Sequence, residues 1–334
     1  MTGHAPSRAA GLVASRRRTG PRQTRPVVAL ALGTFLVVVL AGCGAGRGRQ
    51  PAERPRGSTG PATFTATLQV DGRDRTYRVH LPPAYDGRTP LALLLAFHGG
   101  WGTGVAMASL TGLDQVSDAN RFIAVYPDGI GRSWNAMNGM GTAERRGVDD
   151  VSFVRALIDR LEADFLIAPG RIYATGMSIG AMFVHLLGCQ LSGTLAGIAA
   201  VAGSMPPQVT SQCRPAQPIS VLQIHGTADP RSPYEGGHTA SGGAVEPVTT
   251  TVREWAHRDG CVGEPEAGAL GNGVVQQTYR SCRQGAEVAF IRVDGGGHTW
   301  PGGLQYLPRQ VIGETNRSFD ASQTIWRFLS ARGS

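Results

Sequence analysis

Ser178 lies in a turn of the kind that presents a serine hydroxyl for chemistry. It is the centre of Gly176-Met-Ser-Ile-Gly180, between an apolar β-type run over 172–175 and a helical pattern over 181–187. A strand-to-helix turn holds the hydroxyl at the edge of a sheet, and the small glycines let the two backbones approach each other. In a chain with 47 glycines the pattern alone also fits a serine that merely caps a helix.

An aspartate and a histidine follow two further strand-like runs. Asp229 ends the motif His225-Gly-Thr-Ala-Asp229 after the run at 219–224, and His298 lies in a glycine-rich loop after the run at 288–293. In a Ser-His-Asp triad the serine attacks, the histidine moves its proton, and the aspartate fixes the imidazole tautomer. Singly, each residue also fits a turn or loop. Together, in the chain order Ser, Asp, His, they match the triad of α/β-hydrolases.

A glycine-rich loop is placed to bind negative charge. His98-Gly-Gly-Trp-Gly102 follows the apolar run at 91–97, and its backbone N–H groups suit an oxyanion hole. Donors aimed at the oxyanion of a tetrahedral intermediate are each worth about 3 to 4 kcal/mol. We expect the N–H of Ile179 to be one donor and that of Trp101 to be the other, with Gly100 as the second choice.

These residues need a sheet whose strand ends carry them. Apolar runs that suit strands buried on both faces recur along the chain, with helix-length segments between them. This alternation predicts one domain over 63–334, with a doubly wound, mostly parallel sheet and helices on both faces. Together with the order Ser, Asp, His it matches the α/β-hydrolase fold. Active sites in such sheets form at the carboxyl ends of the strands. The predicted elements are a hairpin of strands at 63–70 and 75–81 with a turn at Asp71-Gly72, buried strands at 91–97, 122–126, 172–175, 198–202, 219–224 and 288–293, and helices at 151–165, 182–187, 249–257 and 322–329.

Residues 1–42 have the pattern of an export signal. Six arginines and no acid lie in residues 1–25, and Pro26 to Gly42 is almost entirely apolar. The run ends in Leu40-Ala-Gly-Cys43, which resembles a bacterial lipobox. We therefore expect Cys43 to carry the lipid that tethers the protein to the outside of the cell membrane. A plain signal peptide, giving a secreted protein, or an uncleaved anchor are the alternatives.

The basic charge of the chain is concentrated near its N-terminus. Residues 43–62, rich in Gly, Pro and Arg, are predicted to be a flexible tether. The first 60 residues hold 10 of the 32 basic residues and one acid, Glu53, and the rest of the chain has 22 basic and 23 acidic residues. The formal charge of +8 therefore belongs to the signal and tether, and it does not predict a nucleic-acid partner.

Four cysteines lie in the predicted domain. An even number in an exported chain predicts two disulfides, for which three connectivities exist. We favour the two short loops, which pair Cys189 with Cys213 and Cys261 with Cys282. No Cys-x-x-Cys pair occurs in the chain, so a zinc or redox site is not expected.

Six motifs together resemble the secreted polyhydroxybutyrate depolymerase and feruloyl esterase family of α/β-hydrolases. The resemblance implies that Ser178, Asp229 and His298 form the triad and that residues 98–101 form the oxyanion loop. It also implies action on feruloyl or acetyl esters of polysaccharide, or on hydroxyalkanoate esters, without a metal or organic cofactor. The motifs are Phe97-His-Gly-Gly-Trp101, Trp134-Asn135, Val148-Asp-Asp-Val-Ser-Phe153, Gly176-Met-Ser-Ile-Gly-Ala-Met182, His225-Gly-Thr-Ala-Asp229 and Gly297-His-Thr-Trp-Pro-Gly-Gly303.

Two tryptophans near these motifs are candidates for substrate contacts. Trp300 closely follows His298, and Trp134 lies in a polar loop rich in Gly and Asn. We expect both to line an aromatic or sugar subsite, although each also fits a place in the core. His185, inside the helix after the serine, is expected to pack in the core and not to act as a second base.

The sequence thus predicts a serine esterase that works through an acyl-enzyme on a small or polymeric ester. Two alternatives remain. The first is a peptidase or lactone hydrolase of the same fold. The second is a non-catalytic surface-binding lipoprotein that keeps the fold. The sequence does not indicate an oligomeric state.

Overall fold

The computed structural model describes residues 62–331 of the chain. The predicted signal segment and Cys43 lie outside the described residues, as does the predicted tether apart from Ala62. Ala62 is the first residue of strand β1 (Ala62–Val70), so the tether ends no later than residue 61. All described residues belong to one compact unit, Gln50–Ser334.

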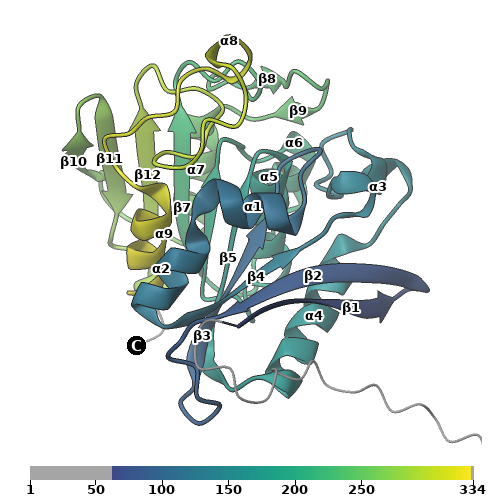
Figure 1. The fold of residues 1–334 in the computed structure, drawn as a ribbon. Coiled ribbons are helices and arrows are strands. Elements are labelled where there is room, and N and C mark those ends of the chain that lie inside the picture. Colours follow the sequence, from purple (N-terminus) through teal and green to yellow (C-terminus); the bar gives the residue numbers. More distant parts are fainter. Residues whose placement is uncertain (1–61, 332–334) are drawn as a thin grey trace, which may run out of the picture. The chain divides into compact units, whose positions relative to one another are not determined.

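Ten strands form one mixed sheet (Figure 1). Their order is β1-β2-β4-β3-β5-β6-β7-β12-β11-β10. The six strands from β4 to β12 in this order run parallel, and the strands at both edges are antiparallel. The predicted α/β-hydrolase fold with its mostly parallel sheet is therefore confirmed. The remaining strands are β2 (Arg73–Leu81), β3 (Leu91–Phe97), β4 (Phe122–Pro127), β5 (Ile167–Met177), β6 (Gly197–Val201), β7 (Ser220–Gly226), β10 (Glu266–Gly271), β11 (Val274–Tyr279) and β12 (Val288–Val293), with β8 (Gly237–His238) and β9 (Ala244–Val245) as a separate pair.

The central strands are apolar because both of their faces are covered. All seven residues of β3 are buried. Leu93 and Leu95 belong to one hydrophobic cluster, and Leu94 and Ala96 to the other. Successive side chains of a strand point to opposite faces, so a strand between two helical layers must be apolar at every position. Each buried leucine contributes roughly 1.5 to 3 kcal/mol relative to an exposed one.

Helices cover both faces of the sheet (Figure 1). Side chains of α1, α2 and α9 join one hydrophobic cluster, and those of α4, α5 and α7 join the other. None of the helices in the described part of the chain is long and apolar enough to cross a membrane. The helices are α1 (Gly104–Thr111), α2 (Leu113–Asn120), α3 (Thr142–Arg145), α4 (Asp150–Asp164), α5 (Ile179–Gln190), α6 (Pro207–Gln212), α7 (Val248–Arg258), α8 (Arg309–Ile312) and α9 (Ala321–Ser330), with the 3-10 turns η1 (Ile130–Arg132) and η2 (Arg283–Gly285).

The predicted hairpin is present, and a second one was not predicted. Asp71 and Gly72 both have positive φ angles, 49° and 71°, as a type I′ turn between β1 and β2 requires. The β10–β11 hairpin at the other edge escaped prediction because all six residues of β10 are exposed and leave no burial pattern. The helices α1 and α2, each of eight residues, are too short for their periodicity to stand out.

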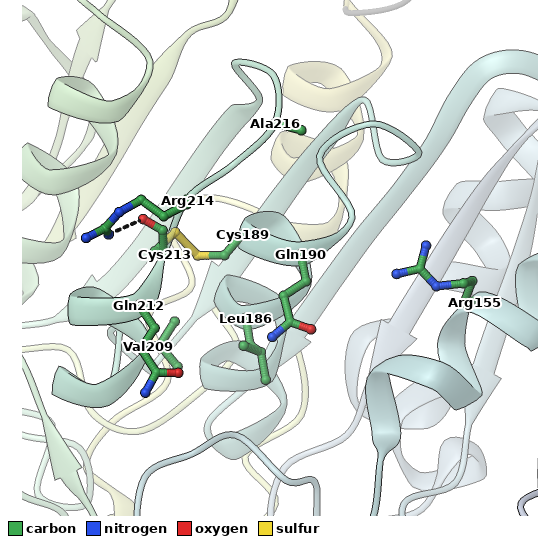
Figure 2. A pocket seen from close by; sticks show the side chains of 9 residues that line it. All are labelled: Arg155, Leu186, Cys189, Gln190, Val209, Gln212, Cys213, Arg214 and Ala216. Atoms are coloured by element: carbon green, nitrogen blue, oxygen red, sulfur yellow. Dashed lines mark hydrogen bonds between the residues drawn. A yellow bond between two sulfur atoms is a disulfide. The ribbon is translucent and has the colours of Figure 1, made fainter.

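Both predicted disulfides are confirmed. Cys189 of α5 is bonded to Cys213, which directly follows α6, and Cys261 is bonded to Cys282. Figure 2 shows the first bond at the side of a cavity of about 350 Å³, which shares no lining residue with the cavity that contains Ser178. This bond ties the end of the helix that follows Ser178 to the segment that leads into β7.

Candidate active site

Ser178 lies in a strained turn between β5 and α5. Its backbone angles, φ 58° and ψ −123°, are in a region that residues other than glycine rarely adopt. The flanking glycines are needed for close packing. A Cβ on Gly176 would lie 2.4 Å from the carbonyl oxygen of Gly180, and one on Gly180 would lie 2.3 Å from that of Phe97. The turn therefore has the geometry of a nucleophile elbow, as predicted.

Asp229 and His298 meet after two adjacent parallel strands, β7 and β12. His298 Nδ1 lies 2.8 Å from Asp229 Oδ2, while Asp229 Oδ1 accepts the backbone N–H groups of Arg231 and Ser232, both at 2.8 Å. Burial opposes the charge on the carboxylate. Hydrogen bonding to His225 and His298 outweighs this effect, so the pKa of Asp229 lies well below its usual range. An ionised Asp229 holds the proton of His298 on Nδ1 and leaves Nε2 free to act as a base.

Ser178 and His298 line the same cavity of about 690 Å³. No hydrogen bond joins their side chains in this structure. Triads commonly close this bond only when substrate is bound. Ser178 and His298 thus face one cavity, and the buried Asp229, which does not line it, contacts His298.

A buried chain of hydrogen bonds continues from Asp229 into the core. Trp255 Nε1 donates to His185 Nδ1, and His185 Nε2 faces Gln223 Oε1, both at 3.0 Å. Gln223 Nε2 then lies 3.3 Å from His225 Nδ1. An indole N–H can only donate, so each following ring and amide must accept on one side and donate on the other. His185 is thus a neutral core residue, as expected, and burial lowers its pKa to about 4.

The same chain fixes the proton of His225 on Nε2. This nitrogen lies 2.9 Å from the carbonyl oxygen of Ser232 and 3.5 Å from Asp229 Oδ2. His225 therefore holds the loop that carries Asp229 and also faces its carboxylate. Sequence reasoning did not identify this role, although His225 stands in the same motif as Asp229.

We expect His225→Leu to lower kcat by about 10- to 100-fold, because losing a buried hydrogen bond costs about 1 to 3 kcal/mol and each ~1.4 kcal/mol is tenfold in rate. His225→Gln should recover part of the loss, because its amide can still donate to Ser232. The pKa of Asp229 should also rise, because the hydrogen bond to His225 is one of the contacts that lower it, so the acid-side loss of stability should begin at a higher pH. His238→Gln, at an exposed histidine, is the matched control. A wild-type kcat in the leucine variant, with its acid-side loss of stability beginning at the wild-type pH, would contradict this role.

The oxyanion loop passes over the elbow, but the structure corrects the first choice of donor. A Cβ on Gly99 would lie 3.4 Å from Ser178 Cβ. The N–H of Trp101 donates to the carbonyl oxygen of Arg132 at 2.9 Å, so it is not free to bind an oxyanion. Among the described residues the N–H of Gly100 has no acceptor. Gly100, the second choice, is therefore the better candidate beside Ile179, whose N–H opens α5.

Trp134 braces this loop and does not line the cavity, which corrects the predicted subsite. Its ring is fully buried, stacks on Phe183 and packs edge-on against Phe97. Its Nε1 donates to the carbonyl oxygen of His98 at 3.0 Å. The His98 ring accepts the N–H of Gly129 on Nε2. These bonds hold the first residue of the oxyanion loop in place.

Trp300 is also a core residue, so the second predicted subsite contact is wrong. It is fully buried in the cluster formed by α1, α2 and α9. Its Nε1 donates to Ser322 Oγ at 2.9 Å, and Ser322 Oγ donates to the carbonyl oxygen of Thr111. Trp300 is not among the residues that line the cavity.

Other aromatic side chains do line the cavity. The Trp101 ring, considered in the sequence only for its backbone, lines it and is 76% exposed. Tyr306 lines it as well and donates from its hydroxyl to the carbonyl oxygen of His298 at 3.0 Å. The sequence offers only one indication of this role, namely that Tyr306 follows the histidine motif closely.

The comparisons with known proteins agree with this geometry. The family model described as phospholipase/carboxylesterase matches residues 129–250. The protein named "Putative esterase NocK", from Nocardia uniformis subsp. tsuyamanensis, is 34% identical over 289 residues, which cover 80% of this chain and 83% of NocK. The chain belongs to the carboxylesterase family of α/β-hydrolases.

Less similar proteins carry narrower names. Feruloyl esterase B of Piromyces equi is 29% identical over 233 residues, which cover 66% of this chain and 42% of that protein. The structure of an acetyl xylan esterase from Aspergillus awamori matches with a TM-score of 0.53 at 14% identity, covering 71% of this chain and 94% of that one. That likeness shows the shared fold alone.

Proposed function

We propose that this carboxylesterase is a serine esterase in which Ser178, His298 and Asp229 form the triad. The 2.8 Å contact between His298 Nδ1 and the buried Asp229 Oδ2 carries the proposal, because His298 lines the same cavity as the strained Ser178. It leaves a basic Nε2 as the acceptor for the serine proton. The N–H groups of Ile179 and Gly100 are the proposed oxyanion donors.

The reaction proceeds in two halves. Ser178 Oγ attacks the ester carbonyl carbon while its proton passes to His298 Nε2, and the carbonyl oxygen becomes the oxyanion. The C–O bond to the alcohol then breaks, and His298 returns the proton to the leaving alkoxide. This leaves an acyl group on Ser178. Water repeats the same steps against the acyl-enzyme and releases the carboxylic acid.

The proposed substrates are feruloyl or acetyl esters of polysaccharide, or esters of the 3-hydroxybutyrate type. The name of the Piromyces relative supports the first class. The exposed Trp101 ring at the cavity offers an apolar face for an aromatic acyl group. We further propose that residues 1–42 are a lipoprotein signal, that Cys43 carries the lipid and that residues 43–61 tether the enzyme outside the cell. The two disulfides support an oxidising compartment.

A substrate panel tests this function. Methyl ferulate, 4-nitrophenyl acetate and a 3-hydroxybutyrate dimer are compared with a peptide and a lactone of similar size. We expect turnover of the esters, with a lower KM for methyl ferulate than for 4-nitrophenyl acetate, the other neutral ester, because of Trp101. Prior treatment with a fluorophosphonate should label Ser178 and abolish this turnover. Cleavage of only the peptide or the lactone, or failure of the probe to label the protein, would contradict the proposal.

A further inference from the structure

Three arginines from separate parts of the chain line the cavity that contains Ser178. Arg132 ends η1, Arg145 ends α3, and Arg231 lies two residues after Asp229. No aspartate or glutamate is among the residues that line this cavity. The described part of the chain has nearly equal numbers of basic and acidic residues, so a general basicity of the surface does not account for this concentration.

None of the three guanidinium groups has a carboxylate partner among residues 62–331. Arg132 Nε lies 3.3 Å from the carbonyl oxygen of Gly102, and Arg145 Nη2 lies 3.3 Å from Thr142 Oγ1. The Arg231 side chain makes no hydrogen bond to the described residues. Outside the cavity some arginines pair with acids and others, such as Arg146, do not, so what distinguishes the three is that they share one cavity that no acid lines. The paired arginines are Arg75, Arg78, Arg160, Arg258, Arg280, Arg292 and Arg309.

Two of these three arginines lie on opposite sides of the proposed catalytic residues. The guanidinium of Arg231 lies near Tyr306, whose hydroxyl contacts the backbone of His298. Burial raises the pKa of Tyr306 to about 12, and the positive charge of Arg231 opposes this rise. Arg132 lies at the oxyanion loop, where its backbone accepts the N–H of Trp101. One cation thus stands on the histidine side of the cavity and another on the oxyanion side.

We propose that the cavity selects esters that carry a carboxylate in their acyl or alcohol part. An unpaired guanidinium presents a planar fork of donors that matches a carboxylate, and a cleft lined by one sign of charge concentrates ligands of the other. This inference rests on the proposed esterase function and narrows its substrate class. An ester of a hydroxy acid has the carboxylate on the alcohol side, and a monoester of a dicarboxylic acid has it on the acyl side.

Two substrate pairs test the charge preference. The first is the mono-4-nitrophenyl ester of adipic acid with its monoamide, and the second is 3-(butyryloxy)butanoate with its primary amide. Each amide is a neutral match for the carboxylate. We expect kcat/KM for the anionic member to exceed that for the neutral one by at least about 10-fold in one pair at low ionic strength. The ratio should shrink in about 0.5 M salt, where charges are screened within a few ångströms. The pair in which kcat/KM differs shows whether the cavity recognises a carboxylate on the acyl side or on the alcohol side of the ester.

Arginine variants decide whether the cavity causes the preference. Arg132→Gln, Arg145→Gln and Arg231→Gln should each reduce the anionic-to-neutral ratio, and the triple variant should bring it close to 1. Because the ratio is measured within one preparation, partial misfolding cancels. Arg146→Gln, at an exposed neighbour that does not line the cavity, should keep the wild-type ratio. A ratio near 1 for both pairs in the wild type, or one that survives the triple substitution, overturns the inference while the esterase function stands. Hydrolysis of no member of either pair overturns both.

Discussion

Ser178→Ala is expected to lower kcat for the best ester by about 10⁵- to 10⁶-fold, the loss typical of removing a catalytic serine. The substitution removes only Oγ. It keeps the backbone N–H groups of the elbow, and alanine meets the same strain at φ 58° as serine does. The melting temperature should therefore change little while the acyl-enzyme can no longer form.

The measurement is kcat against the substrate panel, together with thermal melting and fluorophosphonate labelling. Ser211→Ala, at an exposed serine on α6, is the matched control and should keep wild-type kcat and labelling. If the Ser178 variant retained more than about a tenth of the wild-type turnover, another group would have to be the nucleophile.

Asp229→Asn should lower kcat by about 10⁴-fold, and the reason lies in the direction of its hydrogen bonds. The backbone N–H groups of Arg231 and Ser232 both point at Oδ1, so the oxygen of the new amide must stay there. Its NH₂ group then replaces Oδ2 and faces His298 Nδ1. An NH₂ group only donates, so the ring must accept at Nδ1 and carry its proton on Nε2. In that tautomer His298 cannot take the serine proton.

Nitrogen NMR of the His298 ring gives the tautomer directly, and kcat gives its consequence. Asp320→Asn is the control, because asparagine caps a helix as well as aspartate does and this residue caps α9 away from the site. A loss of less than about 100-fold, with the proton still on Nδ1, would show that Asp229 does not set the tautomer.

The same substitution has a consequence for stability in acid. The pKa of the Asp229 carboxyl is lowered in the fold, so its charged form stabilises the native state above the unfolded pKa. This contribution is lost as the pH falls through the lower, folded value. The asparagine variant should lack that part of the acid-side decline, which denaturant titrations at several pH values can measure.

Much of the candidate site could be predicted because its members stand next to elements with strong local patterns. Ser178, Asp229 and His298 each follow a buried strand, and parallel strands bring their carboxyl ends to one edge of the sheet. The other predictions depended on where a side chain points. Trp134 and Trp300 stand in polar loops beside site residues, yet both rings turn into the core, because each indole N–H finds a buried acceptor there.

Some features had no local signal at all. The N–H of Trp101 is occupied by the carbonyl oxygen of Arg132, a residue 31 positions later in the chain. The hydrogen-bond chain from Trp255 to Asp229 joins α7, α5 and β7 with the loop after β7. The arginines of the cavity likewise come from three separate segments.

The sequence by itself determined the buried parallel strands, the first hairpin and the order of the proposed triad residues, and it favoured the disulfide pairing that the structure has. These follow from local burial periodicity, turn chemistry and spacing, which are properties of short stretches. Only the tertiary structure decided which N–H groups remain free, which rings are core and which charges share the cavity. These depend on contacts between residues far apart in the chain. Such contacts form only when strand order and helix packing have placed the loops, so no short stretch contains them.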